Sequence, residues 1–247
     1  MQSAVQIEVY PTDADAAEAA AALVATHIRA AATPGRATVA LGASRSGRSA
    51  MVALAARGEL PWAAVEWFLA DERCGAAGDP LAHATVARDS LFGPRGIAAS
   101  RVHAPALDGA NAEHVASSYA ATLGEHLGAD GIVDVVLLGI GADGALGALV
   151  PDCAALDVSS WVAVVPAPRP GEPARVAMTP AFVARARHVV VTAVGPDAAR
   201  AVASALRDGR GPAARVLPSE RVTWVVDRGA ADELMKNATP VDAPDRR

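Results

Sequence analysis

One segment of this chain combines closely spaced glycines with a single carboxylate, a pattern that suits chemistry on a bound ligand. Residues 134–152 read DVVLLGIGADGALGALVPD, and Asp143 is the only charge among the glycines. Glycine lets the backbone approach a ligand closely and adopt positive φ. Ligands of open α/β sheets bind beyond the carboxyl ends of the strands, so a turn placed there is a candidate site. The spacing alone fits an ordinary strand–helix turn equally well.

A charged triplet follows a second apolar run. Residues 65–70 (VEWFLA) predict a buried strand, and Asp71, Glu72 and Arg73 come directly after it. A strand end is where sheet-edge sites are built, although a solvated turn with a local ion pair is the alternative. In the polar loop beyond, His83 is a side chain that titrates near neutrality and could serve as a general base. A simply solvated histidine is the alternative there.

Two further segments suit the binding of an anion. The apolar run 37–41 leads into Ser44, Arg45 and Ser46 at a predicted helix start, where free backbone amides, hydroxyls and a guanidinium together can hold a phosphate. The proline-rich segment 166–175 (PAPRPGEPAR) is predicted to be extended and stiff, and it carries two arginines. A capped surface loop and a solvated proline-rich loop are the respective alternatives.

In their order along the chain, these segments resemble the 6-phosphogluconolactonases, part of a wider group that includes the glucosamine-6-phosphate deaminases. GIGADGALGALVP is similar to the family's GxGxDGHxASLFP, and D-E-R is a second family hallmark. The deaminases have N-E-P where this chain has residues 149–151 (LVP), which favours the lactonase branch. The chain departs from the pattern at Ala145, where the family has its catalytic histidine, and at Ala142, where a glutamate is common.

The resemblance implies hydrolysis of 6-phospho-D-glucono-1,5-lactone to 6-phosphogluconate, in the oxidative pentose phosphate pathway, without metal or organic cofactor. A base activates water in that scheme while cationic groups grip the phosphate. The resemblance implies that the phosphate is bound by Arg73, Arg169 and Arg175, together with Ser44, Arg45 and Ser46. Asp143, or as a second choice Asp71, would orient water or ring hydroxyls. Either His83 or Asp143 would replace the missing base, or the enzyme would work at a slow rate without one. The alternatives are a catalytically impaired homologue that binds a sugar phosphate or a partner enzyme, and a rearranged site for another phosphosugar.

Strand-like and helix-like segments alternate, which predicts an α/β fold with a doubly wound, mostly parallel sheet flanked by helices. The resemblance makes this a NagB/RpiA-like fold. We expect a single lactonase-like domain over residues 1–236 and a disordered tail over 237–247. The expected strands are 5–10, 37–41, 65–70, 135–138, 161–165, 188–194 and 222–226, and the clearest helices are 12–32 and 111–127.

The composition of the chain limits the kinds of molecule that we expect it to bind. The chain has 247 residues, 52% of them hydrophobic, a net charge of -5 and a pI near 5.7, so nucleic acid is not expected as a partner. Two cysteines suit neither a disulfide scaffold nor a zinc motif. The sequence shows neither a signal-peptide pattern nor an apolar run long enough to span a membrane, so we expect a cytoplasmic protein that does not bind membranes. We expect it to be a monomer or homodimer and its partner to be a small phosphorylated sugar lactone. His103 is interpreted as structural, whereas His114 and His126 lie off an apolar helical stripe and are expected to be exposed.

Overall fold

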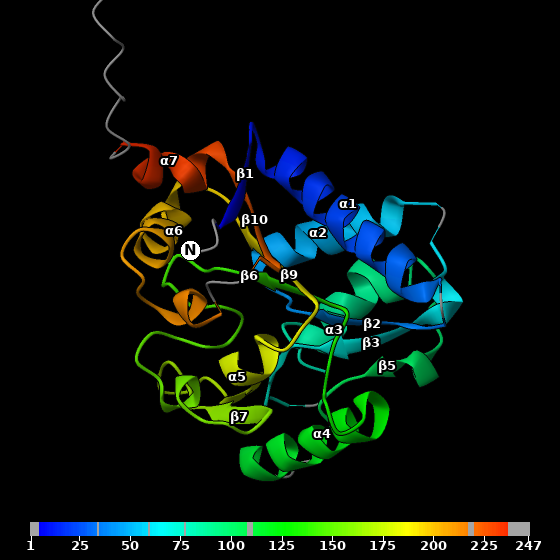
Figure 1. The fold of residues 1–247 in the computed structure, drawn as a ribbon. Helices are drawn as coiled ribbons and strands as arrows, with labels where there is room; N and C mark the ends of the chain where they lie inside the picture. The colour runs from blue at the N-terminus through cyan, green and yellow to red at the C-terminus, as the bar shows by residue number, and fades with distance from the viewer. Residues whose placement is uncertain are drawn as a thin grey trace, which may run out of the picture.

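A parallel sheet of seven strands forms the centre of the molecule (Figure 1). The computed structural model describes residues 5–33, 35–58, 60–76, 78–107, 111–216 and 220–236. The predicted tail, 237–247, lies outside them. The strand order is β1-β10-β9-β6-β2-β3-β5, with every neighbouring pair parallel. The strands are β1 (Gln6–Tyr10), β2 (Ala37–Leu41), β3 (Val65–Leu69), β5 (Val102–His103), β6 (Val135–Gly139), β9 (His188–Ala193) and β10 (Val222–Asp227).

Helices cover both faces of this sheet, which confirms the predicted doubly wound α/β architecture. Side chains alternate between the faces along each strand, so Val39 and Trp67 join one core while Ala40 and Phe68 join the other. The first core contains α1 (Asp13–Ala32), α2 (Arg45–Ala56), α3 (His83–Ala87) and the π-helix η2 (Arg88–Phe92). The second contains α4 (Ala112–Leu127), α5 (Pro180–Val183), α6 (Ala199–Leu206) and α7 (Arg228–Lys236).

Short helical turns connect several of these elements. They are η1 (Trp62–Ala64), η3 (Ala99–Arg101), η4 (Ala154–Leu156), η5 (Pro196–Ala198) and η6 (Pro212–Arg215). None of the helices in the described segments combines the length and apolar character needed to cross a bilayer. The helix expected to start at Thr12 or Asp13 does so, with the Thr12 side chain accepting from the Asp15 amide.

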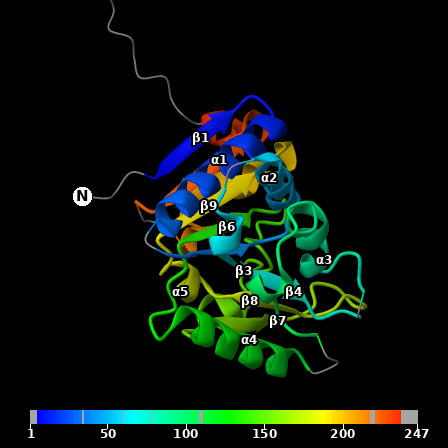
Figure 2. The same ribbon diagram turned by 90° about the vertical axis from the view of Figure 1, so that its right-hand side faces the viewer.

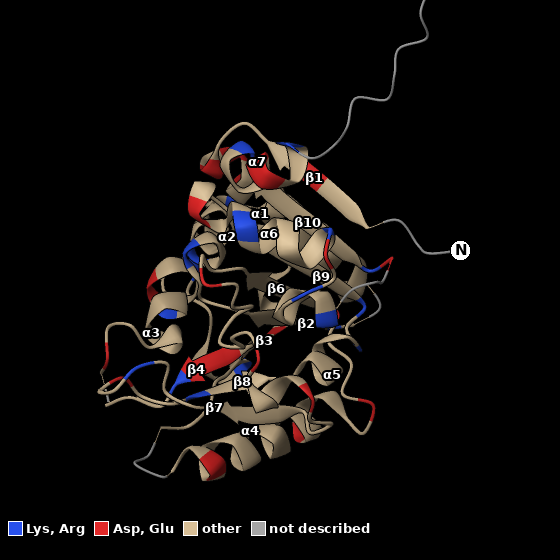
Figure 3. Cartoon of the chain, turned by 90° about the vertical axis from the view of Figure 1, so that its left-hand side faces the viewer, with Lys and Arg blue, Asp and Glu red and all other residues tan. Residues whose placement is uncertain are grey.

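A second, antiparallel sheet of three strands was not predicted from the sequence. Its order is β4 (Asp71–Arg73), β8 (Arg175–Met178) and β7 (Val162–Val165), and it lies between the large sheet and α4 (Figure 2). The charged triplet, for which a solvated turn was the alternative interpretation, is therefore a short strand. It pairs with β8 so that Arg73 stands opposite Arg175, although about one hundred residues of sequence separate them. Figure 3 shows this acidic strand directly above β8.

The chain changes direction within the large sheet at β2, which has β3 on one side and β6 on the other. The loops that leave β2 and β6 consequently diverge to opposite sides and open a crevice at their carboxyl ends. The Gly42 amide donates to the Leu137 carbonyl at 2.8 Å, so the two loops start in direct contact. The fold thus brings the predicted anion loop and the glycine turn to the same edge of the sheet.

Candidate active site

Glycine is required where the β6 turn meets the start of α2. A Cβ on Gly139 would lie 1.9 Å from Ser44 Oγ, and a Cβ on Gly47 would lie 2.3 Å from the Gly42 carbonyl oxygen. The Ser44 side chain caps α2 by accepting from the Gly47 amide at 3.1 Å. The space that a side chain at position 139 would occupy is therefore filled by the hydroxyl that caps the helix.

A row of hydroxyl groups from Ser46 and Thr192 contacts the Ser44 side chain that caps α2. Ser44 Oγ lies 3.3 Å from Ser46 Oγ, and Thr192 Oγ1 donates to Ser46 Oγ at 2.9 Å. Ser46 is only 5% exposed, so it positions Ser44 rather than presenting an open surface. Thr192 was not predicted from the sequence as a site residue. Its one signal was a polar residue near the end of an otherwise apolar strand.

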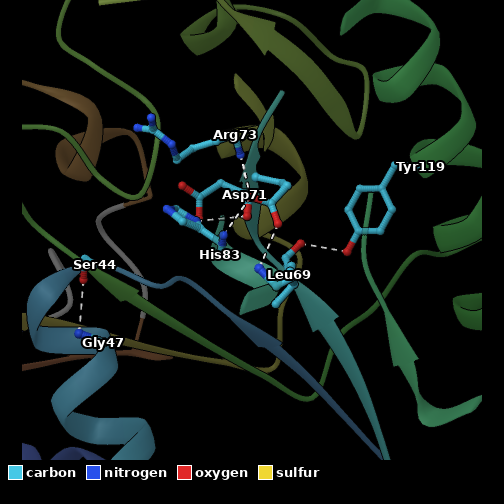
Figure 4. A network of polar contacts seen from close by, with 9 residues as sticks. Ser44, Gly47, Leu69, Asp71, Arg73, His83 and Tyr119 are labelled. Atoms are coloured by element: carbon cyan, nitrogen blue, oxygen red, sulfur yellow. Dashed lines mark hydrogen bonds and ion pairs between the residues drawn. The ribbon is translucent and has the colours of Figure 1, made fainter. Parts of the chain in front are cut away.

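Asp71 and His83 form a buried pair (Figure 4). Asp71 is 1% exposed, and its carboxylate lies within 3.7 Å of the positions that Cβ atoms on Gly42 and Gly147 would take. His83 Nδ1 lies 3.0 Å from Asp71 Oδ1 and 3.1 Å from the Asp71 carbonyl oxygen. The carbonyl oxygen is the better aligned acceptor, so the carboxylate contact is an ion pair rather than a well-directed hydrogen bond.

The charge around His83 changes its acidity. Burial is the largest influence and lowers the pKa of His83, but the Asp71 carboxylate, helped by Glu72, overcomes it and holds this pKa above its ordinary value. Both contacts to Asp71 are made by Nδ1. They favour the tautomer that carries the proton there and leave Nε2 with a free lone pair.

Glu72, the middle residue of the triplet, has a structural role. Its carboxylate accepts from the amides of His83 and Ala84 at 2.7 and 2.8 Å, which caps the start of α3, and also from its neighbour Arg73 at 2.7 Å. The Tyr119 hydroxyl donates to the Leu69 carbonyl at 2.7 Å and anchors the end of β3 just before Asp71 (Figure 4). The backbone on each side of the pair is thereby held in place.

A pocket of ≈ 200 Å³ opens beside this pair. His83, Ala145 and Ser44 line it together with Asp143 and Arg175. The position at which the resembling family has its catalytic histidine thus faces the same hollow as His83. The pocket walls also include Gly139, Gly141, Gly147, Ala148, Val150, Val165, Pro166 and Pro168.

Asp143 lies on the rim of the pocket. Its Oδ1 accepts from the Ala145 amide at 3.1 Å, and a Cβ on Gly141 would lie 2.5 Å from the same oxygen. The side chain therefore shapes the glycine turn. It is also exposed, so one carboxylate oxygen remains available to water or to a ligand in the pocket.

The three arginines expected to converge on a phosphate do not all converge in this structure. Arg175 lines the pocket, its Nε is buried without a hydrogen-bond partner, and it has no ion pair within the described residues. Arg73 Nε instead contacts an Asp79 carboxylate at 3.3 Å. The Arg169 side chain is 82% exposed and lies 3.6 Å from Glu172, because the proline-rich loop carries it into solvent. The guanidinium groups of Arg73 and Arg169 are therefore each paired with a nearby carboxylate. Of the three predicted arginines, Arg175 is the one that lines the pocket.

A second hollow adjoins the first across Ser44 and Gly141. Arg45 lines it and donates from Nη2 to the Val194 carbonyl at 2.7 Å, which holds the guanidinium beside the start of α2. The amino terminus of a twelve-residue helix, a serine hydroxyl and a guanidinium meet here. This combination favours an anion at the junction of the two hollows.

The parallel sheet and the crevice where its strand order reverses define a doubly wound α/β protein with a ligand site at its switch point. Comparisons with known proteins identify the family. The family model described as glucosamine-6-phosphate isomerases/6-phosphogluconolactonase matches residues 11–224. The chain belongs to this family.

Named relatives lie in the lactonase branch. A 6-phosphogluconolactonase of Streptomyces coelicolor is 34% identical over 242 residues, covering 91% of this chain and 92% of its own. A 6-phosphogluconolactonase of Mycobacterium tuberculosis is 30% identical over 243 residues, covering 92% and 98%. The crystal structure of 6-phosphogluconolactonase from Leishmania guyanensis superposes with a TM-score of 0.79 at 25% identity, covering 98% of this chain and 100% of that one.

Proposed function

We propose that this protein hydrolyses 6-phospho-D-glucono-1,5-lactone to 6-phosphogluconate, with His83 as the general base in place of the family's histidine. The observation that carries the proposal is that His83, oriented by the buried Asp71, lines the same pocket as Ala145. The lactonase relatives support the reaction, and the pocket supports the residue assignment. None of the comparisons favours the catalytically impaired alternative.

In this mechanism His83 Nε2 removes a proton from a water molecule as the water attacks the lactone carbonyl carbon. Asp71 stabilises the resulting imidazolium and keeps the ring in its orientation, so Asp71 acts through His83 rather than on the substrate. Collapse of the tetrahedral intermediate breaks the ring C–O bond, and the proton returns from His83 to the departing ring oxygen. Asp143 on the pocket rim orients water or a ring hydroxyl.

The phosphate binds where Ser44 and the start of α2 meet Arg175, with Arg45 on the adjoining side. Arg175 has no acidic partner among the described residues, so a phosphate would supply the counter-charge that it lacks. Arg73 and Arg169 could join the grip only by leaving Asp79 and Glu172. Binding energy at the phosphate would then position the ring for attack near His83.

The test is the rate of lactone opening by purified protein, corrected for spontaneous hydrolysis. We expect His83→Asn to lower kcat by about 10²–10⁴, the usual contribution of a positioned base. His114→Asn is the matched control, because His114 is exposed on α4 and should keep the wild-type rate. Calorimetric binding of 6-phosphogluconate shows that the variant is folded. Full activity in a folded His83→Asn protein would refute the assignment.

Restoring the family's histidine separates the proposal from the impaired alternative. Ala145 is 7% exposed and lines the pocket, so the imidazole in Ala145→His would enter the same hollow as His83. We expect measurable wild-type activity, and recovery of most of the lost rate in the double variant with His83→Asn. A wild type that binds 6-phosphogluconate without any turnover would instead support a binding protein.

We further expect a cytoplasmic protein that acts as a monomer or homodimer.

A further inference from the structure

Two histidines and a glutamate from three separate elements meet away from the active site. Glu66 on β3, His103 on β5 and His126 on α4 each offer one ligand atom, and these atoms all lie within 4.8 Å of one another. The Glu66 and His103 side chains are 12% and 9% exposed. From this geometry we propose that Glu66, His103 and His126 form a binding site for a divalent transition-metal ion of the Zn²⁺ class.

The distances suit the metal. Glu66 Oε2 and His103 Nε2 are hydrogen-bonded at 2.7 Å, a contact that the ion would replace, and the ring centroids of His103 and His126 are 3.8 Å apart at a tilt of 36°. Tetrahedral Zn²⁺ with bonds of about 2.0–2.1 Å holds its ligand atoms about 3.3 Å apart. A shift of about 0.6 Å would admit the ion between Glu66 and His103. Three protein ligands leave a fourth position for water.

The cluster can offer lone pairs and one carboxylate oxygen to a cation. Within the described part of the chain, the ring nitrogens of His126 make no hydrogen bond, so a lone pair is available. A metal ion would use one ring nitrogen lone pair from each histidine. Arg101 Nη1 contacts the other glutamate oxygen, Oε1, at 2.7 Å, which orients the carboxylate and leaves Oε2 for the metal. The Arg101 side chain is 37% exposed and can turn away from the added charge.

The surroundings of the cluster also suit a metal centre. The ring centroid of Phe68 lies 4.9 Å from that of His103 and 6.3 Å from that of His126, forming an apolar wall on one side. Three strand residues and a bend, 67–70, lie between Glu66 and Asp71, and none of the three cluster residues lines the active-site pocket, so the ion would take no part in the lactone chemistry. It would instead join the end of α4 to β5, the two-residue strand at the edge of the sheet. No metal was expected from the sequence, because the family resemblance implies none and the cysteines match no zinc spacing. His126, which was expected to be exposed, is half-buried.

The test is titration of chelator-treated, full-length protein with Zn²⁺ by calorimetry, and with Co²⁺ by visible absorption. We expect one equivalent to bind, a higher Tm with Zn²⁺, and a tetrahedral Co²⁺ spectrum. His126→Ala should weaken binding at least 100-fold and abolish the rise in Tm. It removes no ring hydrogen bond to a described residue, so the variant should fold. Glu66→Gln should also weaken binding.

Two control variants locate the site. His114→Ala removes an exposed histidine from the same helix, and His27→Ala breaks the stacked His27–His188 pair elsewhere on the surface. Both should bind Zn²⁺ as the wild type does. No stoichiometric binding by the wild type would overturn the proposal. Undiminished binding by His126→Ala, or loss of binding in His27→Ala, would overturn it as well.

Discussion

The Asp71–His83 pair predicts how activity depends on pH. Asp71 Oδ1 and His83 Nδ1 are 3.0 Å apart. At an effective dielectric constant of about 20, a charged pair at this distance attracts by about 5 kcal/mol before the opposing effect of burial is counted. Burial lowers the pKa of His83, but the carboxylate outweighs burial and holds this pKa above 6.5. We expect kcat/KM to fall as the pH drops through this raised pKa, because a protonated imidazole cannot act as a base.

Asp71→Asn is the informative change. Without the carboxylate the pKa of His83 falls, so the acidic limb of the pH profile should move to lower pH. The plateau rate should also fall, by up to the 10²–10⁴ expected for losing the base, since an amide can donate to Nδ1 and favour the wrong tautomer. Asp79→Asn is the control. Asp79 pairs with Arg73, so its loss should leave the limb in place.

Stability supplies an independent measurement of the same pair. Because the folded protein has the higher pKa for His83, the pair contributes fully to the free energy of unfolding below pH 6.5. That contribution is lost as the pH rises through the raised pKa. The Tm advantage of the wild type over Asp71→Asn should therefore shrink as the pH increases. An acidic limb at the same pH in both proteins, or a Tm difference that grows with pH, would refute the reasoning.

Two further predictions concern the walls of the pocket. Gly139→Ala forces a Cβ to within 1.9 Å of Ser44 Oγ. Overpacking and loss of the helix cap should lower its free energy of unfolding, measured by urea denaturation, by about 2–4 kcal/mol. The control is Gly58→Ala, which has open space around it and should change this free energy by less than about 0.5 kcal/mol. Arg175→Ala should weaken calorimetric binding of 6-phosphogluconate about 10–100-fold, the value of a charge-assisted hydrogen bond, while Arg169→Ala should change it less than about 3-fold. Equal effects of the two arginine variants would contradict the assignment.

Much of the large sheet was predictable because its signal is local. The run 37–41 is β2 with unchanged bounds, and 135–138, 188–194 and 222–226 became strands within one residue at their ends. Short, mostly apolar runs of this length are typical of strands that are buried on both faces of a parallel sheet. Alternation with helices then determined the doubly wound architecture.

The small antiparallel sheet was not predictable, because the pairing of Arg73 with Arg175 depends on tertiary contacts rather than on local pattern. The contacts of Arg73, Arg169 and Arg175 could not be predicted from the sequence for the same reason. Whether a guanidinium faces a hollow or a nearby acid depends on the backbone that carries it. Arg169 lies in the proline-rich loop and Arg175 begins β8, so two arginines close in sequence have different surroundings.

The sequence by itself determined the family, the parallel sheet and the residues worth testing, since apolar periodicity and motif order are properties of the chain alone. Only the tertiary structure decided which side chains meet. It placed His83 against Asp71, left Arg175 alone in the pocket, and brought Glu66 to His126 across sixty residues of sequence. Side-chain chemistry depends on distances of a few ångströms, and such distances between remote residues exist only once the elements have packed.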